Sequence, residues 1–403
     1  MAALSLSIPR VAYCTDTFGE INGVATVSQQ FQAYAQRRGL PWMIVRPGPE
    51  TRAFTEGSVE IVELAKSPFC LPLDMGLRFD LLQWRHAPWL AKQFQRFRAD
   101  VIHVTGPGDI GMLAAKISHR LPTATGLVKT PLVASWHTNL HQYARMRCSG
   151  WMPRRMDSLV GGLIERGSFR AAARFYQLAR LTLAPNPEVL DDLCRCTHKP
   201  GFVMPHGVDT FRFKPRIPQP HTGPVVLGYV GRLTPEKNVR FLAEVAAKLP
   251  PGSFKFLIVG DGSEREWLEK AIPQAEFRGI LRGAELAAAY AEMDVFLFPS
   301  HSDTFGLVIL EAMASAVPVV TFQQSGPCVA VRDGETGFTA ACPDLFAQRV
   351  TQLIENTSLR ESLAQEAQRQ SSKFSWDTVF EAVYESYASL VPTGSTWAPA
   401  LAT

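Results

Sequence analysis

The sequence contains no apolar run that approaches the ~20 residues needed to span a bilayer as a helix. A helical membrane protein is therefore not expected. The stretch before the first predicted strand, Met1–Pro9, is short for a secretory signal peptide, so we expect a cytoplasmic protein. Neither charge dominates, because 41 Lys and Arg stand against 37 Asp and Glu.

Cysteine pairs with the spacing of a metal site are also missing. The seven cysteines are scattered, and the nearest pair, Cys194 and Cys196, has no second Cys or His pair at zinc spacing after it. We interpret them as ordinary thiols. No Gly-x-Gly-x-x-Gly follows the first predicted strand, which argues against a dinucleotide-dependent oxidoreductase.

The residues that are present indicate a globular chain of more than one domain. The 403 residues are 46% hydrophobic and 19% charged, and this length favours two or three domains. Residues 1–205 hold 24 Lys and Arg against 15 Asp and Glu, a net +9. Residues 206–403 hold 17 against 22, a net −5, so the two halves present different surfaces, as two domains would.

Patterns of buried strands alternate with helical patterns along both halves. The predicted strands of the first half are 10–14, 41–45, 101–104, 132–136 and 181–184. Pro-rich chain from 214 to 224 marks a linker, and the strands predicted after it are 225–230, 254–259, 295–298 and 317–321. This alternation predicts an α/β fold of two Rossmann-like domains that face each other across a cleft. Ligands of such sheets bind at the carboxyl ends of the strands.

A loop with two cations follows the strand that ends at Val230. Arg232 and Lys237 lie five positions apart, just before a predicted helix. A guanidinium that can bind in a bidentate manner and a mobile ammonium suit a diphosphate, whose negative charge grows when it leaves. Strand-to-helix loops often carry such residues without binding phosphate, and that alternative stays open for the loop alone.

Two carboxylates flank the start of a later helix. Gly306 allows close approach of the backbone, and the free amides of the helix that begins there can bind an anion. Asp303 precedes this helix, and Glu311 lies in an otherwise apolar run inside it. Both can accept hydrogen bonds from the vicinal hydroxyls of a sugar or ribose. In the alternative, Asp303 caps the helix and Glu311 faces solvent.

A basic stretch runs from Arg145 to Arg180, with eight Arg against Asp157 and Glu165. Three of its arginines are four residues apart and form one stripe if the segment is helical: Arg166, Arg170 and Arg174. The stripe and the aromatic residues near it predict either a face for an anionic membrane or acceptor, or a solvated helix face above a core.

The second half resembles the family 4 glycosyltransferases over most of its length. The motifs that carry the resemblance are Gly231-Arg-Leu-x-Pro-Glu-Lys237, the segment from Asp303 through Phe305-Gly306-Leu307 to Glu311, Ser325-Gly-Pro327, and Asp333-Gly-Glu-Thr-Gly337. The first half resembles the family more loosely, at Asn22-Gly23-Val24 and at Trp136-His137-Thr138. The family usually has Glu where Asp303 stands, and often Asp where Asn139 stands.

The resemblance implies a GT-B fold and a retaining mechanism without a metal or another cofactor. It assigns 1–205 to an acceptor-side domain, 206–375 to a nucleotide-sugar-binding domain, 376–392 to a helix that returns to the first domain, and 393–403 to a tail. Arg232 and Lys237 would bind the donor diphosphate, Glu311 the ribose, and Asp303 the transferred sugar. Gly23, Phe305, Gly306 and Leu307 would complete the donor site, and His137 would lie near the reacting carbon.

The resemblance defines the substrates less narrowly than it defines the fold. GDP-mannose or a UDP-hexose is the expected donor, and a lipid or glycan is the expected acceptor. An anionic membrane is a further expected partner, at the inner face of the membrane, and no nucleic acid is expected. A sugar-nucleotide epimerase or phosphorylase on the same architecture stays open as an alternative. So does a nucleotide-sugar-binding protein without catalysis, which Asp303 and Asn139 motivate.

Overall fold

The computed structural model describes residues 8–20, 22–72, 78–121, 129–137, 166–215, 223–301, 303, 305–323 and 330–391. Asn139, the basic stretch before Arg166, the motif at 325–327 and the tail 393–403 lie outside these ranges. The chain divides into two compact units. The described parts of the first lie up to His137, within Arg166–Met204 and from Trp376 on, and the second contains Pro205–Ser375.

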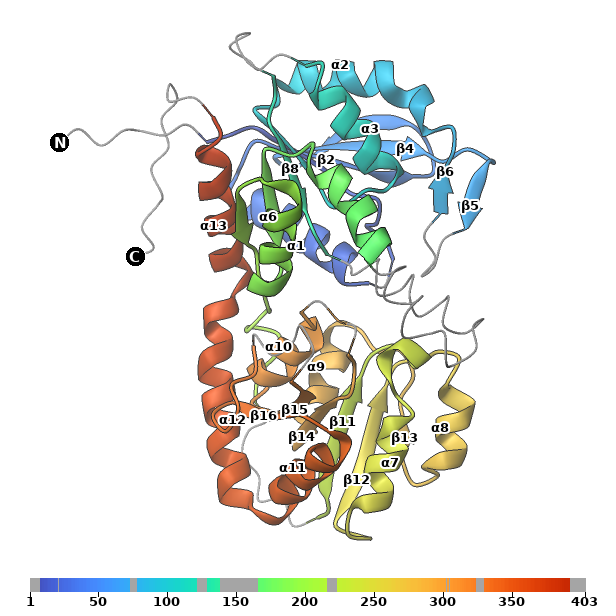
Figure 1. Ribbon diagram of the computed structural model, residues 1–403, viewed down its shortest axis with the longest axis vertical. Helices are drawn as coiled ribbons and strands as arrows, with labels where there is room; N and C mark the ends of the chain where they lie inside the picture. Colours follow the sequence, from blue (N-terminus) through green and yellow to red (C-terminus); the bar gives the residue numbers. More distant parts are fainter. Residues whose placement is uncertain are drawn as a thin grey trace, which may run out of the picture. The chain divides into compact units, whose positions relative to one another are not determined.

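An eight-stranded sheet forms the centre of the first unit (Figure 1). Its order is β10-β9-β8-β7-β1-β2-β4-β3, and all neighbours are parallel except the edge pair β3–β4. The bounds are β1 Val11–Cys14, β2 Trp42–Gly48, β3 Arg52–Glu56, β4 Val59–Ala65, β7 Val101–Val104, β8 Leu132–Ser135, β9 Leu181–Ala184 and β10 Gly201–Val203. The neighbouring strands β1 and β7 lie in the middle of this sheet and are fully buried.

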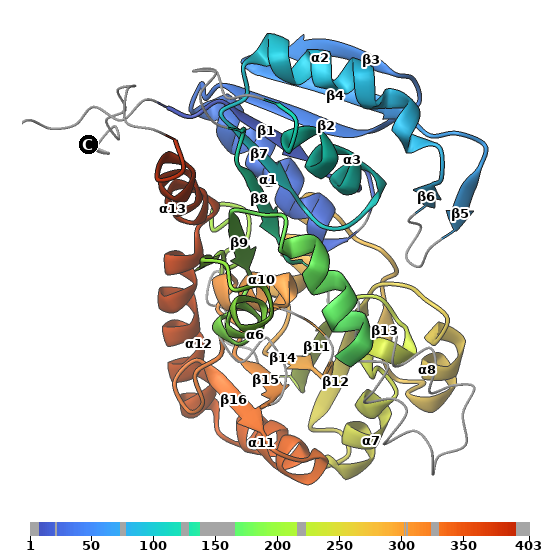
Figure 2. The ribbon, with the colours of Figure 1, turned by 45° about the horizontal axis from the view of Figure 1, so that its top comes forward.

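Helices cover both faces of this sheet, as the alternation predicts. Apolar side chains from one face pack with α2 (Ala87–Phe97), α3 (Asp109–Ser118) and α6 (Pro187–Thr197), and Figure 2 shows α2 and α3 beside the sheet. Aromatic rings from the other face pack with α1 (Gly23–Arg37) and α13 (Trp376–Ala388). A small antiparallel pair, β5 (Cys70–Pro72) and β6 (Arg78–Asp80), precedes the short helix η2 (Gln83–His86).

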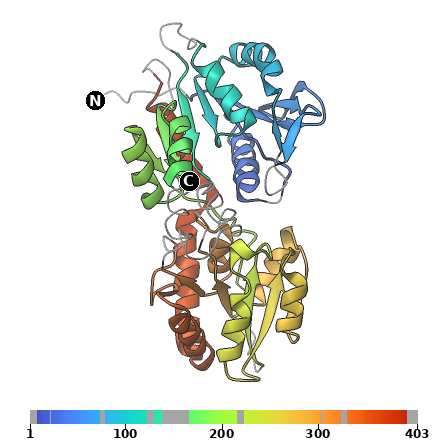
Figure 3. The same cartoon turned by 45° about the vertical axis from the view of Figure 1, so that its right-hand side comes forward.

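A parallel six-stranded sheet forms the centre of the second unit, in the order β13-β12-β11-β14-β15-β16. Its strands lie in the yellow-to-orange part of Figure 3. The bounds are β11 Val225–Val230, β12 Phe254–Val259, β13 Glu276–Phe277, β14 Val295–Phe298, β15 Val319–Phe322 and β16 Gly337–Ala340. The fully buried β11 and β14 are neighbours, so the loops that follow them meet at one edge.

The second sheet is also covered on both faces. One face packs against α7 (Phe241–Lys248), α8 (Arg265–Ala271) and α11 (Pro343–Glu355), and the other against α9 (Gly283–Ala291) and α10 (Leu307–Ala314). A further helix of this unit, α12, is Thr357–Ser371. Across the parts of the chain that the structure describes, no helix is long and apolar enough to cross a membrane.

Candidate active site

The loop after β11 is held in shape by contacts to its backbone from neighbouring groups. The Tyr229 hydroxyl donates to the carbonyl of Arg232 at 2.9 Å. Gly260, at the end of the neighbouring strand β12, has a φ of 134°, and a Cβ there would lie 1.9 Å from the carbonyl oxygen of Gly231. Glycine is therefore required at this close approach. The loop ends in the short helix η3 (Pro235–Lys237), which presents the second cation.

Both predicted cations lie near Asp303, whose side chain is 19% exposed. The ammonium of Lys237 is 2.5 Å from Oδ1 of Asp303, and the guanidinium of Arg232 is 3.1 Å from Oε1 of Glu236. Burial favours a raised pKa for Asp303, but Lys237, Ser300 and Arg232 outweigh this effect and hold its pKa below the usual value. The structure thus brings Arg232, Lys237 and Asp303 together, and their contact with a donor stays a prediction.

The start of α10 does not match the alternative in which Asp303 caps the helix. Its N-cap residue is Gly306, with a φ of 78°, and no side chain among the described residues caps the helix. Asp303 pairs with Lys237 instead of with the helix amides. Phe305 is fully buried just before the helix, and Leu307 is its first residue. The first amides of α10 therefore remain a candidate anion site beside the two cations.

Glu311 does not behave as a solvated surface acid. It is half-buried, and the Tyr290 hydroxyl of α9 donates to its Oε2 at 2.8 Å. Burial raises the pKa of Glu311 to about 7, although Tyr290 and then Arg212 oppose the rise. Ionisation of the Glu311 carboxyl is unfavourable in the free protein. A ligand that donates hydrogen bonds from hydroxyl groups would stabilise the ionised form.

His206 is a buried neighbour of this site that none of the motifs above singles out. It is 5% exposed, and its ring centroid lies 5.0 Å from that of Phe305. Burial lowers its pKa to about 4, against an opposing effect of the nearby Asp303. His206 is therefore neutral near pH 7. It lies in the segment Pro205–Asp209, which resembles a family motif that usually has Asn in place of His206.

The first unit holds the other two predicted residues, one at the start of a helix and one just after a strand. Gly23 is the exposed first residue of α1, and the side chain of Asn22 caps that helix by accepting from the amide of Ala25 at 2.8 Å. His137 follows β8, is 8% exposed, and contacts the Ser135 hydroxyl through Nε2 at 2.7 Å. Their roles toward a sugar stay predictions.

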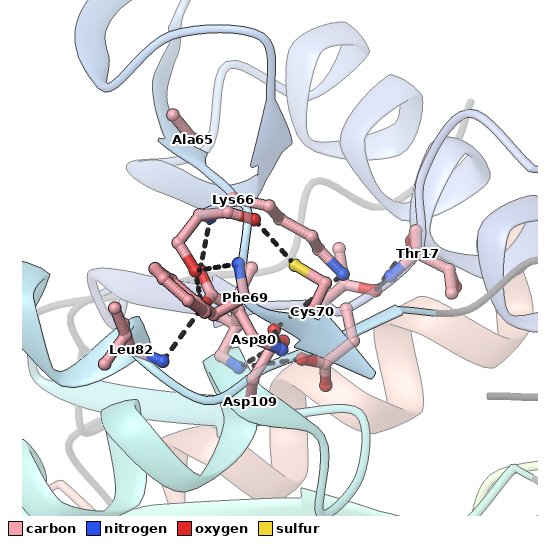
Figure 4. Close-up of polar contacts among 12 residues, drawn as sticks. Thr17, Ala65, Lys66, Phe69, Cys70, Asp80, Leu82 and Asp109 are labelled. Atoms are coloured by element: carbon pink, nitrogen blue, oxygen red, sulfur yellow. Dashed lines mark hydrogen bonds and ion pairs between the residues drawn. The ribbon is translucent and has the colours of Figure 1, made fainter. Parts of the chain in front are cut away.

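Asp16, in the loop between β1 and α1, has a structural role. Its Oδ1 accepts from the amide of Ile110 at 2.8 Å and so satisfies an amide in the first turn of α3. Burial, with Asp109 adding to it, raises its pKa well above the usual value. Asp109 in turn accepts from the amide of Asp80 at 2.9 Å and lies 3.8 Å from Lys66. Figure 4 shows Asp80 and Asp109 close to each other, with Lys66 beside them.

The arginine stripe is helical and exposed. Residues 166–176 form a helix in which Arg166, Arg170 and Arg174 are all exposed. The opposite side of this helix packs inward, with the rings of Phe169 and Tyr176 at 5.5 and 5.1 Å from that of Trp136. Phe169 and Tyr176 therefore belong to the core, and the three arginines are exposed on the other side of the helix.

Two family models match the chain and meet near the boundary of the two units. The model described as "Glycosyltransferase Family 4" matches residues 21–212, and that described as "Glycosyl transferases group 1" matches residues 224–356. The chain belongs to the family 4 glycosyltransferases. These matches confirm the resemblance found in the sequence motifs.

Individual relatives agree with this family. Sulfoquinovosyl transferase SQD2 of Arabidopsis thaliana is 31% identical over 310 residues, which are 72% of this chain but only 56% of the plant protein. A GDP-mannose-dependent alpha-mannosyltransferase of Mycolicibacterium smegmatis is 29% identical over 342 residues, 81% of this chain and 83% of that protein.

Solved structures confirm the GT-B fold. Sucrose-phosphate synthase of Thermosynechococcus elongatus superposes with a TM-score of 0.71 at 15% identity, and covers 94% of this chain and 99% of its own. Anabaena HepE in complex with UDP-glucose gives a TM-score of 0.67 at 18% identity, again over 94% of this chain and 99% of that one.

Proposed function

We propose that this glycosyltransferase retains the configuration of the sugar it moves. It transfers a hexose, mannose or glucose, from a nucleotide-diphosphate donor to a lipid or glycan acceptor, without a metal. The observation that carries the proposal is the grouping of Arg232 and Lys237 around Asp303, beside the uncapped start of α10. Relatives named for GDP-mannose and for sulfoquinovosyl transfer support a nucleotide-sugar donor.

The chemistry of the proposal follows from charge. The bond between the sugar C1 and the phosphate oxygen breaks, and its electron pair goes to the diphosphate. Arg232, Lys237 and the amides of α10 stabilise that charge because they are fixed before the reaction. The acceptor oxygen bonds to C1 from the same face, and its proton passes to the departing phosphate oxygen. Glu311 holds the ribose hydroxyls, Asp303 the sugar hydroxyls, and His137 assists at the sugar.

A thermal-shift panel of nucleotide-sugars tests the donor. The true donor is expected to raise the melting temperature, because a ligand at 100 times its Kd stabilises the folded state by ~2.7 kcal/mol. GDP-mannose, UDP-glucose and their free nucleotides form the panel, and Lys237→Ala provides the variant that lacks one cation. If no nucleotide-sugar shifted the melting temperature while Lys237→Ala melted like the wild type, the donor site would be assigned wrongly.

Release of nucleoside diphosphate separates the transferase from its alternatives. A transferase releases it in proportion to the acceptor consumed. An epimerase converts the donor without an acceptor and without this release. A binding protein without catalysis is stabilised by the donor but releases nothing.

The proposal also includes an anionic membrane surface as a partner. This partner rests on two exposed features of the first unit. One is the arginine stripe on the helix at 166–176. The other is a group of exposed large apolar side chains near η2: Phe69, Leu71, Leu81, Leu82 and Trp84. The ammonium of Lys116 lies 4.4 Å from the centre of the Trp84 ring, so cationic and apolar groups adjoin. Such a combination suits an anionic membrane surface.

Vesicle co-sedimentation tests this partner. Changing Arg166, Arg170 and Arg174 to Glu is expected to weaken binding to vesicles with anionic lipid by at least 100-fold, since each basic residue near the surface contributes ~1 kcal/mol. A matched triple reversal on the second unit, at the exposed Arg282, Arg332 and Arg369, is the control and should bind as the wild type does. Equal binding by both triple variants would remove the arginine stripe from the proposal.

A further inference from the structure

Four buried polar side chains of the first unit form a continuous hydrogen-bonded chain that ends at His137. The Tyr387 hydroxyl of α13 is 2.5 Å from Nδ1 of His103 on β7. Nε2 of His103 is 2.9 Å from the Ser135 hydroxyl on β8, which is 2.7 Å from Nε2 of His137. Tyr387, His103 and Ser135 are 0% exposed, so water does not compete for these bonds.

The direction of the chain follows from its inner end. Tyr387 keeps its proton, because burial raises its pKa well above the usual value. Within the described part of the protein, its hydroxyl has one hydrogen bond, to His103. A buried O–H group must be donated, so Nδ1 of His103 accepts. His103 is neutral, since burial lowers its pKa to about 3, and therefore it carries its proton on Nε2.

The remaining steps fix the tautomer of His137. Nε2–H of His103 donates to the Ser135 oxygen, and the Ser135 hydroxyl must find another acceptor. The carbonyl of Val104 lies 3.5 Å away, too far for a strong bond, whereas Nε2 of His137 lies at 2.7 Å. Nε2 of His137 is therefore an acceptor. A neutral imidazole whose Nε2 is unprotonated carries its proton on Nδ1.

The surroundings keep the chain in one arrangement. The Tyr13 ring meets the His103 ring edge-on, with centroids 4.9 Å apart. The Tyr387 ring lies 5.4 Å from that of Tyr384 and stacks with Phe31 at 6.5 Å. Close-packed rings leave little freedom to the rotamers of Tyr387 and His103, so the hydrogen bonds are preorganised.

We propose that Tyr387, His103 and Ser135 are positioning residues that hold His137 as the neutral Nδ1–H tautomer for glycosyl transfer. This inference rests on the proposed function, because it gives His137 its task at the sugar. It also assigns a role to α13 in the first unit. Tyr387, which lies 284 positions after His103, then determines which ring nitrogens of the histidines carry protons. A cationic His137 is disfavoured, because Nε2 would then need to donate to Ser135.

The tautomer can be measured without activity. In protein labelled with ¹⁵N-histidine, two-bond proton–nitrogen spectra show which ring nitrogen carries the proton, and His137→Gln identifies the His137 signals. The wild type is expected to show protonated Nδ1 and bare Nε2 at His137. Ser135→Ala removes the donor that fixes this pattern and should give a mixture of tautomers. Protonated Nε2 in the wild type would overturn the inference.

Kinetics then test the link to transfer. Ser135→Ala and Tyr387→Phe are expected to lower kcat by about 10- to 100-fold, the usual cost of losing a supporting contact, with the donor KM within two-fold. The matched control is Tyr384→Phe on the same helix, because the Tyr384 hydroxyl has no hydrogen-bond partner among the described residues. It should keep the tautomer and kcat of the wild type.

The outcomes separate this inference from the proposed function. If Ser135→Ala changes the tautomer but not kcat, the positioning role is wrong while the transferase stands. If Ser135→Ala does not fold, Tyr387→Phe against Tyr384→Phe decides the same question. If no donor binds at all, the proposed function fails, and the tautomer measured in the wild type still confirms or overturns the proton pattern.

Discussion

Replacing Arg232 or Lys237 with Ala is expected to lower kcat/KM by about 30- to 1,000-fold, which corresponds to ~2–4 kcal/mol of transition-state stabilisation. Each side chain is only partly exposed, at 32% and 16%, so its charge acts where water screens it weakly. The loss should fall mainly on kcat, because the charge on the departing diphosphate is larger in the transition state than in the bound donor. Steady-state kinetics, with the donor that the thermal-shift panel identifies, measures the losses in kcat and in kcat/KM.

Lys237→Ala also leaves Asp303 without its nearest cation, and breaking such a pair costs ~3 kcal/mol of folding stability. The double variant with Asp303→Asn removes that charge. Its melting temperature should recover, while its affinity for a free nucleoside diphosphate, which has no sugar for Asp303 to hold, should stay low. Recovery of that affinity would show that Lys237 acts through folding and does not contact phosphate. The exposed Arg240, changed to Ala, is the neighbouring control.

The fold was predictable where strands are buried on both faces. The runs at 101–104, 181–184, 225–230, 254–259 and 295–298 have the predicted bounds, because a parallel strand between helix layers is mostly apolar. The edge pair β3–β4 was not predicted. Its outer strand, Arg52–Glu56, is mostly exposed and polar, and its turn depends on Gly57, whose φ is 60°. A strand that buries little leaves a weak pattern in the sequence.

The positions of Arg232, Lys237 and His137 in loops after buried strands were predictable, because the strands themselves were. The partners of these residues were not. Asp303 was expected to contact a sugar or to cap α10, and its ion pair with Lys237 depends on how two loops 66 positions apart meet. The hydrogen-bonded chain of Tyr387, His103 and Ser135 could not be predicted from the sequence for the same reason. Tertiary contacts between distant side chains leave no periodic pattern.

Glu311→Gln is expected to weaken donor binding by about 10- to 100-fold, because hydrogen bonds to a charged acceptor contribute ~1.5–3 kcal/mol each and the neutral amide cannot replace two of them. The effect depends on pH. The pKa of Glu311 in the free protein is about 7, and ribose hydroxyls favour the ionised form. The Kd of the wild type should therefore rise about ten-fold for each pH unit below 7, as one proton must be lost on binding. The variant should show no such slope in titrations from pH 5.5 to 8.5.

The free protein should show the opposite dependence in its stability. A pKa raised from 4.5 to about 7 on folding means that the folded state binds the proton more tightly than the unfolded chain does. The stabilising contribution is complete below pH 4.5 and is lost as the pH rises through 7. Compared with Glu311→Gln, the wild type should therefore melt progressively lower between pH 5 and 8. Tyr290→Phe removes the hydroxyl that lowers this pKa, so both transitions should move to higher pH in that variant. Transitions that stayed in place in Tyr290→Phe would assign the titration to another group and leave Glu311 without its role at the ribose.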